Sequence, residues 1–379
     1  MKSFSLYIHY PWCESLCHYC DYNRFHMVEK SQIERYVFAL IEDLKFESKH
    51  HFDHVISSIY FGGGTPSKFT PDCLSMLMQE IKKTFPISYN CEVSIELNPE
   101  DAGKNYLIEL KKLGFNRISL GVQSLDDLAL KYLGRNHRKK DVISAISNIR
   151  LAGFDNLNID LILDIAYPKN SNRSFWDVEN ILLYKPEHVS LYEIKSNSNV
   201  VDDQNNTCQY DDGLNRFFDL QQLLFRNDFI QYEINSYSKK NYECLQGLNN
   251  WNFGDYLGLG AGACTRMTMN DWVYVGSKPT QPKEYITRIF NDKDCHSDWL
   301  DAGDSFYLAT EYLISTTRLR SGFKLSEFRK KRFANDWKMW ACKIDTAMRK
   351  GLLLQEGDWI RPTPLGFRFL DDLHLSLIE

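Results

Sequence analysis

The first 200 residues of this 379-residue chain alternate between strand-like and helix-like segments, and this alternation constrains the fold most strongly. Short apolar or alternating runs predict strands at Ser5–His9, Val55–Phe61, Cys91–Leu97, Arg117–Val122, Asn156–Leu163 and His188–Ile194. Helical spacing predicts helices between them, at Gln32–Glu47, Pro71–Phe85, Asn105–Leu113, Asp141–Ala152 and Phe175–Tyr184. Repeated β-then-α units predict a parallel sheet with right-handed crossovers. We therefore expect an α/β barrel or partial barrel whose site lies at the C-terminal rim of the strands.

Three cysteines, Cys13, Cys17 and Cys20, follow the first predicted strand on one short loop. Three thiolates can hold three irons of a 4Fe–4S cluster, and the fourth iron would stay open because the usual cluster takes four ligands. A small molecule could coordinate that open iron and receive an electron. Zinc sites usually combine two pairs of cysteines that are each separated by two residues, or pairs of cysteine and histidine. No second group of ligands appears downstream of these three cysteines. Three buried, inert thiols are the alternative interpretation.

Composition excludes several classes of protein. The net charge of −5 and the pI of about 6.1 argue against a nucleic-acid binder driven by phosphate contacts. The sequence contains no apolar run of about 18 residues, so we expect no transmembrane segment. The start, Met1 to Phe4, lacks the apolar stretch of a signal peptide. Ten cysteines without an export signal suggest a reducing compartment, and we expect a cytoplasmic protein.

The second half of the chain has a different pattern. The polar stretch 196–212 predicts a linker or mobile loop, and a helix at Leu214–Phe225 and a strand at Phe229–Tyr237 follow. Beyond residue 300 we expect helices, a short hairpin and a final helix from Pro364, which together look like a winged-helix unit used for docking or as a lid. We divide the chain into a barrel domain at 1–200, a connecting α/β segment at 201–300 that completes the barrel mouth, and a helical domain at 301–379.

Further motifs occur in a fixed order after the cysteine run. They are Gly62-Gly63-Gly64-Thr65-Pro66-Ser67, Glu96-Leu97-Asn98-Pro99, Gly121-Val122-Gln123-Ser124, Leu133-Gly134-Arg135-Asn136-His137, Asn158-Ile159-Asp160-Leu161 and Gly258-Leu259-Gly260-Ala261-Gly262-Ala263. Their joint order and spacing resemble the family of radical S-adenosylmethionine (SAM) proteins that contains oxygen-independent coproporphyrinogen III oxidase (HemN) and the haem chaperone HemW. The resemblance covers nearly the whole chain and implies a radical SAM partial (β/α)6 barrel with a C-terminal winged-helix-like domain.

The same resemblance implies the cofactors and their chemistry. Cys13, Cys17 and Cys20 would be the catalytic metal ligands of a 4Fe–4S cluster, and SAM would chelate the open iron. One electron, from a donor such as flavodoxin or ferredoxin, would cleave SAM to methionine and a 5′-deoxyadenosyl radical. The radical would then take a hydrogen atom from a small-molecule substrate. In such a protein the cofactor carries the hard chemistry, and the chain supplies position and electrostatics.

The resemblance also implies a set of SAM-binding residues: Tyr7, Tyr19, Gly63, Gly64, Thr65, Glu96, Gln123, Arg135, Asp160, Ile194 and Cys264. The glycines allow backbone to approach a ligand closely, and a plain strand-to-helix turn is the alternative. Glu96 can accept from the SAM amino group, and Tyr19 can stack on the adenine. Arg135 and Asp160 can reach a carboxylate, ribose or substrate, although Arg135 could instead form a structural salt bridge.

The chain departs from the family at two places. Tyr22 stands where the oxidases have a fourth cysteine, which favours the chaperone branch. The chaperones carry a His-Asn-x-x-Tyr-Trp signature whose histidine is implicated in haem binding, and here the matching stretch is Gln246 to Trp251, in which only Trp251 is retained. A glutamine amide is a poorer iron ligand than imidazole. The cofactor side of the site therefore looks intact and the substrate side looks changed.

Three functions follow from this pattern. The first is a radical SAM enzyme with a changed substrate, such as a methyltransferase or cyclopropanase that uses two SAM molecules. The second is a haem chaperone, more a binding protein than an enzyme. The third is coproporphyrinogen III oxidation. From the loss of the signature histidine we predict weak haem binding without a defined histidine ligand.

Overall fold

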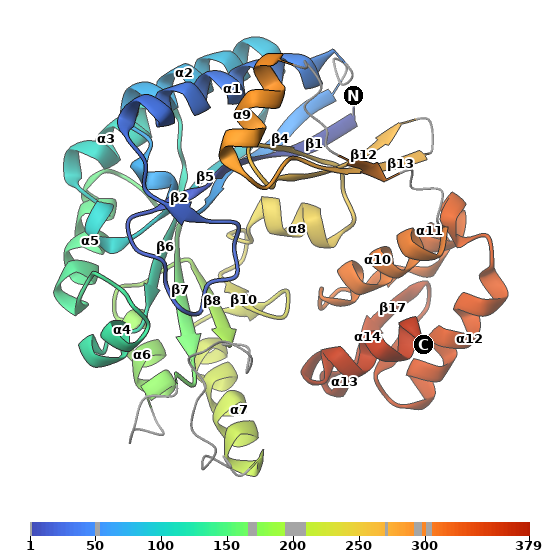
Figure 1. Cartoon of the computed structure of the whole chain (residues 1–379). Helices are drawn as coiled ribbons and strands as arrows, with labels where there is room; N and C mark the ends of the chain where they lie inside the picture. The colour runs from blue at the N-terminus through green and yellow to red at the C-terminus, as the bar shows by residue number, and fades with distance from the viewer. Residues whose placement is uncertain are drawn as a thin grey trace.

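The computed structural model describes residues 2–49, 54–165, 173–193, 210–269, 272–291, 298–300 and 305–379. Its main sheet contains seven parallel strands, in the spatial order β11-β1-β4-β5-β6-β7-β8 (Figure 1). These strands are β1 (Lys2–Tyr10), β4 (His54–Gly63), β5 (Ile87–Leu97), β6 (Arg117–Gln123), β7 (Leu157–Leu163), β8 (His188–Glu193) and β11 (Tyr256–Leu259). The predicted α/β fold and all six predicted strands are confirmed, whereas β11 was not predicted.

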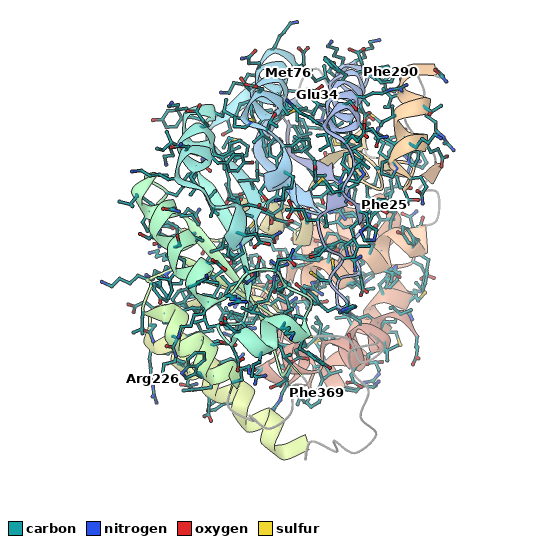
Figure 2. The ribbon with its side chains drawn as sticks, turned by 60° about the vertical axis from the view of Figure 1, so that its left-hand side comes forward. Phe25, Glu34, Met76, Arg226, Phe290 and Phe369 are labelled. Carbon is teal, nitrogen blue, oxygen red and sulfur yellow. The ribbon has the colours of Figure 1, made fainter. Side chains whose placement is uncertain are left out.

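Six helices lie on the outer side of the sheet between its strands (Figure 1). They are α1 (Lys30–Ser48), α2 (Pro71–Thr84), α3 (Lys104–Leu113), α4 (Asp127–Tyr132), α5 (Lys139–Leu151) and α6 (Arg173–Leu182). The five predicted helices are present, and the short α4 is an addition. Figure 2 shows Glu34 of α1 and Met76 of α2 on the outer surface. None of the helices in the described ranges is long and apolar enough to cross a membrane.

The strands have one apolar face and one polar face. Along β6, Ile118, Leu120 and Val122 are buried in the core against the helices, while Arg117 and Ser119 face a cavity on the other side. This follows from the two-residue period of a strand, which sends successive side chains to opposite faces. Because side chains from both β1 and β8 line the same cavity, the sheet curves around it as a partial barrel.

The two edges of the sheet are built by the middle of the chain. One edge carries β10 (Ser236–Ser238) and β9 (Ile230–Gln231) after α7 (Tyr210–Arg226). The other edge carries β12 (Cys264–Met269), β13 (Trp272–Ser277) and β14 (Asp298–Leu300), with α8 (Leu245–Trp251) before them and α9 (Pro282–Asn291) between β13 and β14.

The single strand predicted at Phe229–Tyr237 is wrong. The segment forms the two short antiparallel strands β9 and β10, because the chain reverses at Glu233, whose carbonyl accepts from the Ser236 N–H at 3.3 Å. Apolar periodicity cannot show such a reversal. Most of the polar stretch predicted as a linker, 196–209, lies outside the described residues, and Tyr210 already begins α7.

The C-terminal region has its own apolar core, which includes Leu313, Phe328, Trp340 and Ile360. Its helices are α10 (Ser305–Thr317), α11 (Leu325–Lys330), α12 (Trp337–Arg349), α13 (Pro364–Arg368) and α14 (Leu370–Ile378). A small sheet in the order β15-β17-β16 completes it, from β15 (Phe323–Lys324), β16 (Leu353–Glu356) and β17 (Trp359–Pro362). A single final helix from Pro364 was predicted, but the structure has two helices there. The helix is interrupted because the backbone of Phe369 leaves the helical conformation.

Candidate functional site

A cavity of about 650 Å³ lies inside the curved sheet and is lined by the cysteine loop, the inner face of the strands and α8. It brings together most of the residues predicted for the site: Tyr7, Cys13, Cys17, Tyr19, Cys20, Gly63, Gly64, Thr65, Glu96, Gln123, Arg135 and Asp160. Ile194 lies outside the described residues. Cys264 is the exposed first residue of β12 and is not among the residues that line the cavity.

The cysteine loop is bounded by a short pair of parallel strands, β2 (Trp12–Cys13) and β3 (Phe25–His26). Arg24 shapes the loop, because its Nη2 donates to the carbonyl oxygens of Cys17 and Cys20, each at 2.6 Å. Arg135 reaches the loop from the other side, with its Nη1 3.7 Å from the Cys17 sulfur. Two guanidinium groups therefore lie beside the loop that carries the three cysteines, and their positive charge is complementary to an anionic cluster.

The environment of Cys13 shows opposing effects on its thiol. Burial raises the pKa of Cys13, whereas a hydrogen bond with the Thr65 side chain and the charge of Arg24 lower that pKa, and the net result is a raised value. No three His, Cys, Asp or Glu side chains of the described residues converge as they would around a single metal ion. A four-iron cluster with one open iron makes a different demand, one thiolate at each of the other three irons. Three cysteines on one loop with Arg24 and Arg135 beside them fit that demand.

The first glycine run is required by contacts within the protein. Gly63 has φ +114°, and a Cβ there would lie 2.6 Å from the His9 ring. A Cβ on Gly64 would lie 2.6 Å from the carbonyl oxygen of Trp12, just before the cysteine loop. Both glycines therefore let β4 approach the segment that carries Cys13, and both also line the cavity.

Two buried carboxyl groups face the cavity. Glu96, at the end of β5, accepts from the Tyr60 hydroxyl at 2.9 Å and from the Gly63 N–H at 3.2 Å. Burial, and then the charge of Asp160, raise the pKa of Glu96 to about 7. Burial also raises the pKa of Asp160, although Asn158 and Ser119 donate to it at 2.8 and 3.2 Å. Both groups are thus poised to gain from a positively charged partner.

Arg135 and Gln123 complete this rim of the cavity. The Nη2 of Arg135 donates to the Asn98 side chain at 2.7 Å and to the Gly121 carbonyl at 3.0 Å, and both of these acceptors are neutral oxygens. Gln123 has φ +68°, at a bulge where β6 loses register with β7. A non-glycine residue held in the left-handed region often marks a functional site.

The second glycine motif, Gly258 to Ala263, contacts the segments on either side of the cysteine loop. Tyr36 of α1 donates its hydroxyl proton to the His9 carbonyl at 2.8 Å and accepts from the Ala261 N–H at 2.8 Å. A Cβ on Gly260 would lie 2.5 Å from that hydroxyl. Asn23, three residues after Cys20, donates to the Ala261 carbonyl at 3.0 Å. The motif therefore helps to fix the position of the cysteine loop through Tyr36 and Asn23.

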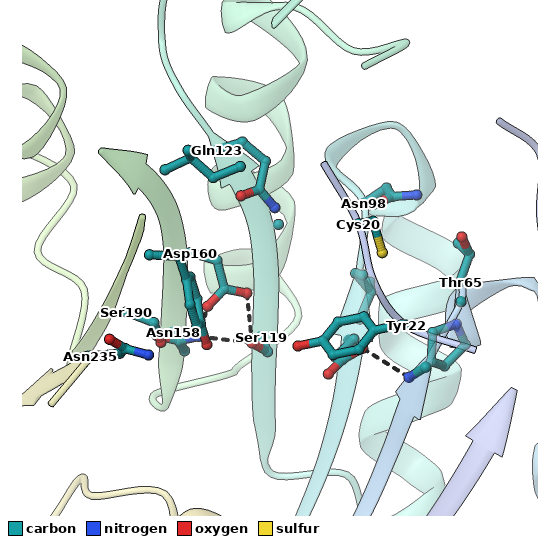
Figure 3. Close-up of a pocket in the computed structure, with 18 of the residues that line it drawn as sticks. Cys20, Tyr22, Thr65, Asn98, Ser119, Gln123, Asn158, Asp160, Ser190 and Asn235 are labelled. Carbon is teal, nitrogen blue, oxygen red and sulfur yellow. Dashed lines mark hydrogen bonds between the residues drawn. The ribbon is translucent and has the colours of Figure 1, made fainter. Parts of the chain in front are cut away.

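Several cavity residues were missed by the sequence analysis, among them Tyr22, Tyr60, Arg117, Asn158, His188 and Ser190. In Figure 3, Tyr22 extends from the cysteine loop into the cavity, opposite Ser119 and Asp160. The strand residues share one signal, since each occupies a polar position that alternates with apolar ones along its strand. The alternation that predicts a strand therefore also indicates which of its side chains share the polar face.

The altered signature also faces this cavity. Gln246 is buried and its Oε1 accepts from the Ser58 hydroxyl at 3.0 Å. Trp251, the retained residue, lies beneath the guanidinium of Arg318, 4.2 Å from its ring centre. Gln246, Trp251 and Arg318 all line the cavity. The position at which the chaperones have a histidine is therefore part of the same site as the three cysteines.

Comparisons with known proteins agree with this arrangement. Residues 7–167 match the family model described as the radical SAM superfamily. The haem chaperone HemW of Buchnera aphidicola subsp. Acyrthosiphon pisum is 30% identical, over 97% of this chain and 96% of its own length. HemW of Haemophilus influenzae is also 30% identical, over 97% of this chain and 96% of its own length. The structure of Escherichia coli coproporphyrinogen III oxidase (HemN), a radical SAM enzyme, aligns with a TM-score of 0.83 and 18% identity, over 99% of this chain and 90% of its own.

These relatives change the order of the three candidate functions. The sequence analysis placed a radical SAM enzyme with a changed substrate first. The full-length matches bear the name haem chaperone, and they support the second candidate better than the first. The similarity to HemN, at 18% identity, shows the shared fold.

Proposed function

This chain belongs to the HemN/HemW family of radical SAM proteins, and we propose that it is a haem chaperone of the HemW type. The observation that carries the proposal is the single cavity that joins the three cysteines to Gln246, the position of the chaperone histidine. The full-length similarity to HemW proteins supports the same assignment. A chaperone must release its cargo, so moderate affinity for haem is compatible with this role.

Membership of the radical SAM family implies a 4Fe–4S cluster and SAM, and we propose that the cavity holds both. Cys13, Cys17 and Cys20 would bind the cluster, with Arg24 and Arg135 balancing its negative charge. When bound, the reduced cluster supplies one electron for cleavage of SAM, and a flavodoxin- or ferredoxin-like protein would be the donor. Glu96 and Asp160 would orient the amino group and ribose of SAM.

We also propose that the chain divides into domains at about residue 300, and that the barrel and the C-terminal domain both contribute to one binding site. Arg318, which follows α10, lines the cavity together with residues of the barrel. Phe253 and Val273, from the middle segment, join the apolar core of the C-terminal region. The C-terminal domain would therefore form one wall of the binding site and could control access to it.

Glu96→Gln should leave the cluster loaded and weaken SAM binding roughly tenfold or more. The substitution removes one charge-assisted hydrogen bond to the SAM amino group, which is worth about 1.5–3 kcal/mol. The measurement is SAM affinity by equilibrium dialysis after anaerobic reconstitution. Glu100→Gln is the matched control, because Glu100 also lines the cavity but faces His137, whose Nδ1 lies 3.4 Å from the Glu100 carboxyl group. Equal SAM affinity in Glu96→Gln and wild type would remove this role from Glu96.

SAM affinity should rise with pH in a way that depends on Glu96. Burial raises the pKa of Glu96 to about 7, so the carboxylate that attracts the amino group forms as the pH passes upward through that value. A titration from about pH 6 to about pH 7.5 stays below the usual pKa of α-amino groups, about 7.7–8.0. Wild type and Glu100→Gln should gain affinity over this range, and Glu96→Gln should not. A slope that persists in Glu96→Gln would point to a different titrating group.

Gln246→His should strengthen haem binding. Gln246 is buried against Ser58 and lines the cavity, so an imidazole there would face the bound cargo. We expect the wild type to bind haem weakly and without a histidine-ligated spectrum, and the variant to gain both affinity and an imidazole-type Soret band. Gln221→His, on α7 outside the set of cavity residues, serves as control. Tight binding by the wild type with a six-coordinate imidazole spectrum would contradict this prediction.

A radical SAM enzyme with a changed substrate is the second candidate, and the observation that favours it is Gln246 itself. Loss of the signature histidine removes the feature most specific to haem binding. Anaerobic incubation with dithionite and SAM separates the two candidates. The chaperone should release no S-adenosylhomocysteine, whereas a methyltransferase or cyclopropanase that uses two SAM molecules should form it together with 5′-deoxyadenosine.

A further inference from the structure

Arg117 is a buried cation of the cavity at the N-terminal end of β6, whereas the cysteine loop meets β6 near its C-terminal end, through Arg135. Arg117 is the first residue of β6, its side chain is 2% exposed, and it lines the cavity. Gln123, at the other end of the same strand, lies beside the rim that carries the cysteine loop. Six residues of extended strand separate the two, about 20 Å. Arg117 therefore belongs to a part of the cavity distinct from the proposed cluster site.

The polar residues around Arg117 satisfy one another. Asn158 donates to the Ser119 hydroxyl and to Asp160, each at 2.8 Å, and its oxygen accepts from His188 at 2.6 Å. The second ring nitrogen of His188 is bonded to the Tyr232 hydroxyl at 2.8 Å. Figure 3 shows Asn158, Asp160 and Ser119 at this wall of the cavity. This wall is a closed hydrogen-bond network that needs no ligand.

Arg117 is the exception to this pattern. Its Nε and Nη1 are buried and have no hydrogen-bond partner among the described residues. The nearest carboxylate, Glu92, is 3.9 Å from Nε, too far for a hydrogen bond. Oxygens of Glu92 already accept from the Ser94 hydroxyl at 3.0 Å and from the Leu245 N–H at 3.3 Å. A buried guanidinium with unused donors is costly, and a ligand or ion that completes it would remove that cost.

We propose that Arg117 anchors a carboxylate-binding subsite at this end of the cavity, and that the subsite takes a propionate of haem. The inference rests on the proposed function and names how the cargo is held. A guanidinium can donate two parallel hydrogen bonds to a carboxylate, and this interaction is stronger in a buried site than at the surface.

The side chains that line the cavity favour binding of haem through its propionates and not through a ligand to its iron. Of the described residues that line the cavity, His188 alone is a histidine, and both of its ring nitrogens are committed to Asn158 and Tyr232. Gln246 offers only an amide oxygen, which already accepts from Ser58. Two other carboxyl groups, Glu96 and Asp160, line the cavity, and burial raises the pKa of both, which disfavours the charged forms that would repel a ligand carboxylate.

The test compares haem with haem dimethyl ester, in which both propionates are neutral. Wild type should bind haem about tenfold more tightly than the diester, as expected for losing a charge-assisted bond. Arg117→Met should bind haem about as weakly as the wild type binds the diester, and its affinity for the diester should be unchanged. Arg117→Lys, which keeps the charge but loses the fork, should fall between the two. The readout is the Soret titration, with far-UV circular dichroism confirming the fold of each variant.

Controls separate this subsite from other effects of losing a charge. Arg226→Met removes an exposed arginine on α7, visible at the outer surface in Figure 2, and should leave both affinities unchanged. SAM affinity should fall far less than haem affinity in Arg117→Met, because Arg117 acts on Glu96 only through its charge. Equal haem binding by Arg117→Met and wild type overturns the subsite alone. Loss of haem, diester and SAM binding together shows a structural role and also overturns it. A wild type that binds no haem overturns the proposed function as well.

Discussion

Replacing Cys13, Cys17 and Cys20 together by alanine should abolish iron binding. The three side chains line one cavity on a loop that Arg24 and Arg135 hold and surround with positive charge. Each of the three ligated irons depends on its own thiolate, so even a single substitution should lose most of the iron. The measurement is iron and sulfide content with visible absorbance after anaerobic reconstitution.

The matched control for this prediction is Cys342→Ala, which removes an exposed cysteine of α12. It should retain full iron and the brown absorbance band. Arg24→Met should give an intermediate result, because it removes the two hydrogen bonds that shape the loop but leaves the ligands. Full iron content in the triple alanine variant would show that the cluster is bound elsewhere.

Lys278→Met should cost about 3–5 kcal/mol of the free energy of unfolding, the usual effect of removing one partner from a buried ion pair. Lys278 is 1% exposed and bonds Asp43 and Glu47 of α1, each at 2.7 Å. Tyr285 of α9 also donates to Asp43 at 2.7 Å. Burial lowers the pKa of Lys278, but the two carboxylates outweigh that effect and raise it. This group ties α1 to the segment between β13 and α9.

Urea unfolding followed by circular dichroism measures this effect, with Lys45→Met as control. Lys45 forms an exposed pair with Glu42 at 2.9 Å, and such pairs contribute at most about 1 kcal/mol. Adding Asp43→Asn and Glu47→Gln to Lys278→Met should recover part of the loss, because it removes the stranded carboxylates. Equal free energies of unfolding for Lys278→Met and Lys45→Met would show that the buried ion pairs of Lys278 do not stabilise the fold.

The sequence predicted the parallel α/β core because strand and helix periods differ clearly along the first 200 residues. It missed β11 and α8, which are only four and seven residues long and whose places depend on contacts distant in sequence. Tyr256 to Leu259 become a strand by pairing with Ser5 to Ile8, about 250 residues away. No local pattern contains that information.

The candidate site was predicted better on its cofactor side than on its cargo side. The motifs on the cofactor side are local, so their residues could be named from the sequence, and twelve of the predicted site residues line one cavity. Arg117 and His188 could not be placed, because their significance depends on which polar atoms are left without partners once the barrel has closed. Arg117 is such a residue, whereas His188 is fully bonded.

The most direct test of the account is an anaerobic Soret titration of the reconstituted wild-type protein with haem, with and without SAM. The account predicts weak but saturable binding of a single haem per chain, with a spectrum that lacks histidine ligation. Absence of saturable binding, together with formation of S-adenosylhomocysteine from SAM, would contradict the chaperone assignment and favour an enzyme with a changed substrate.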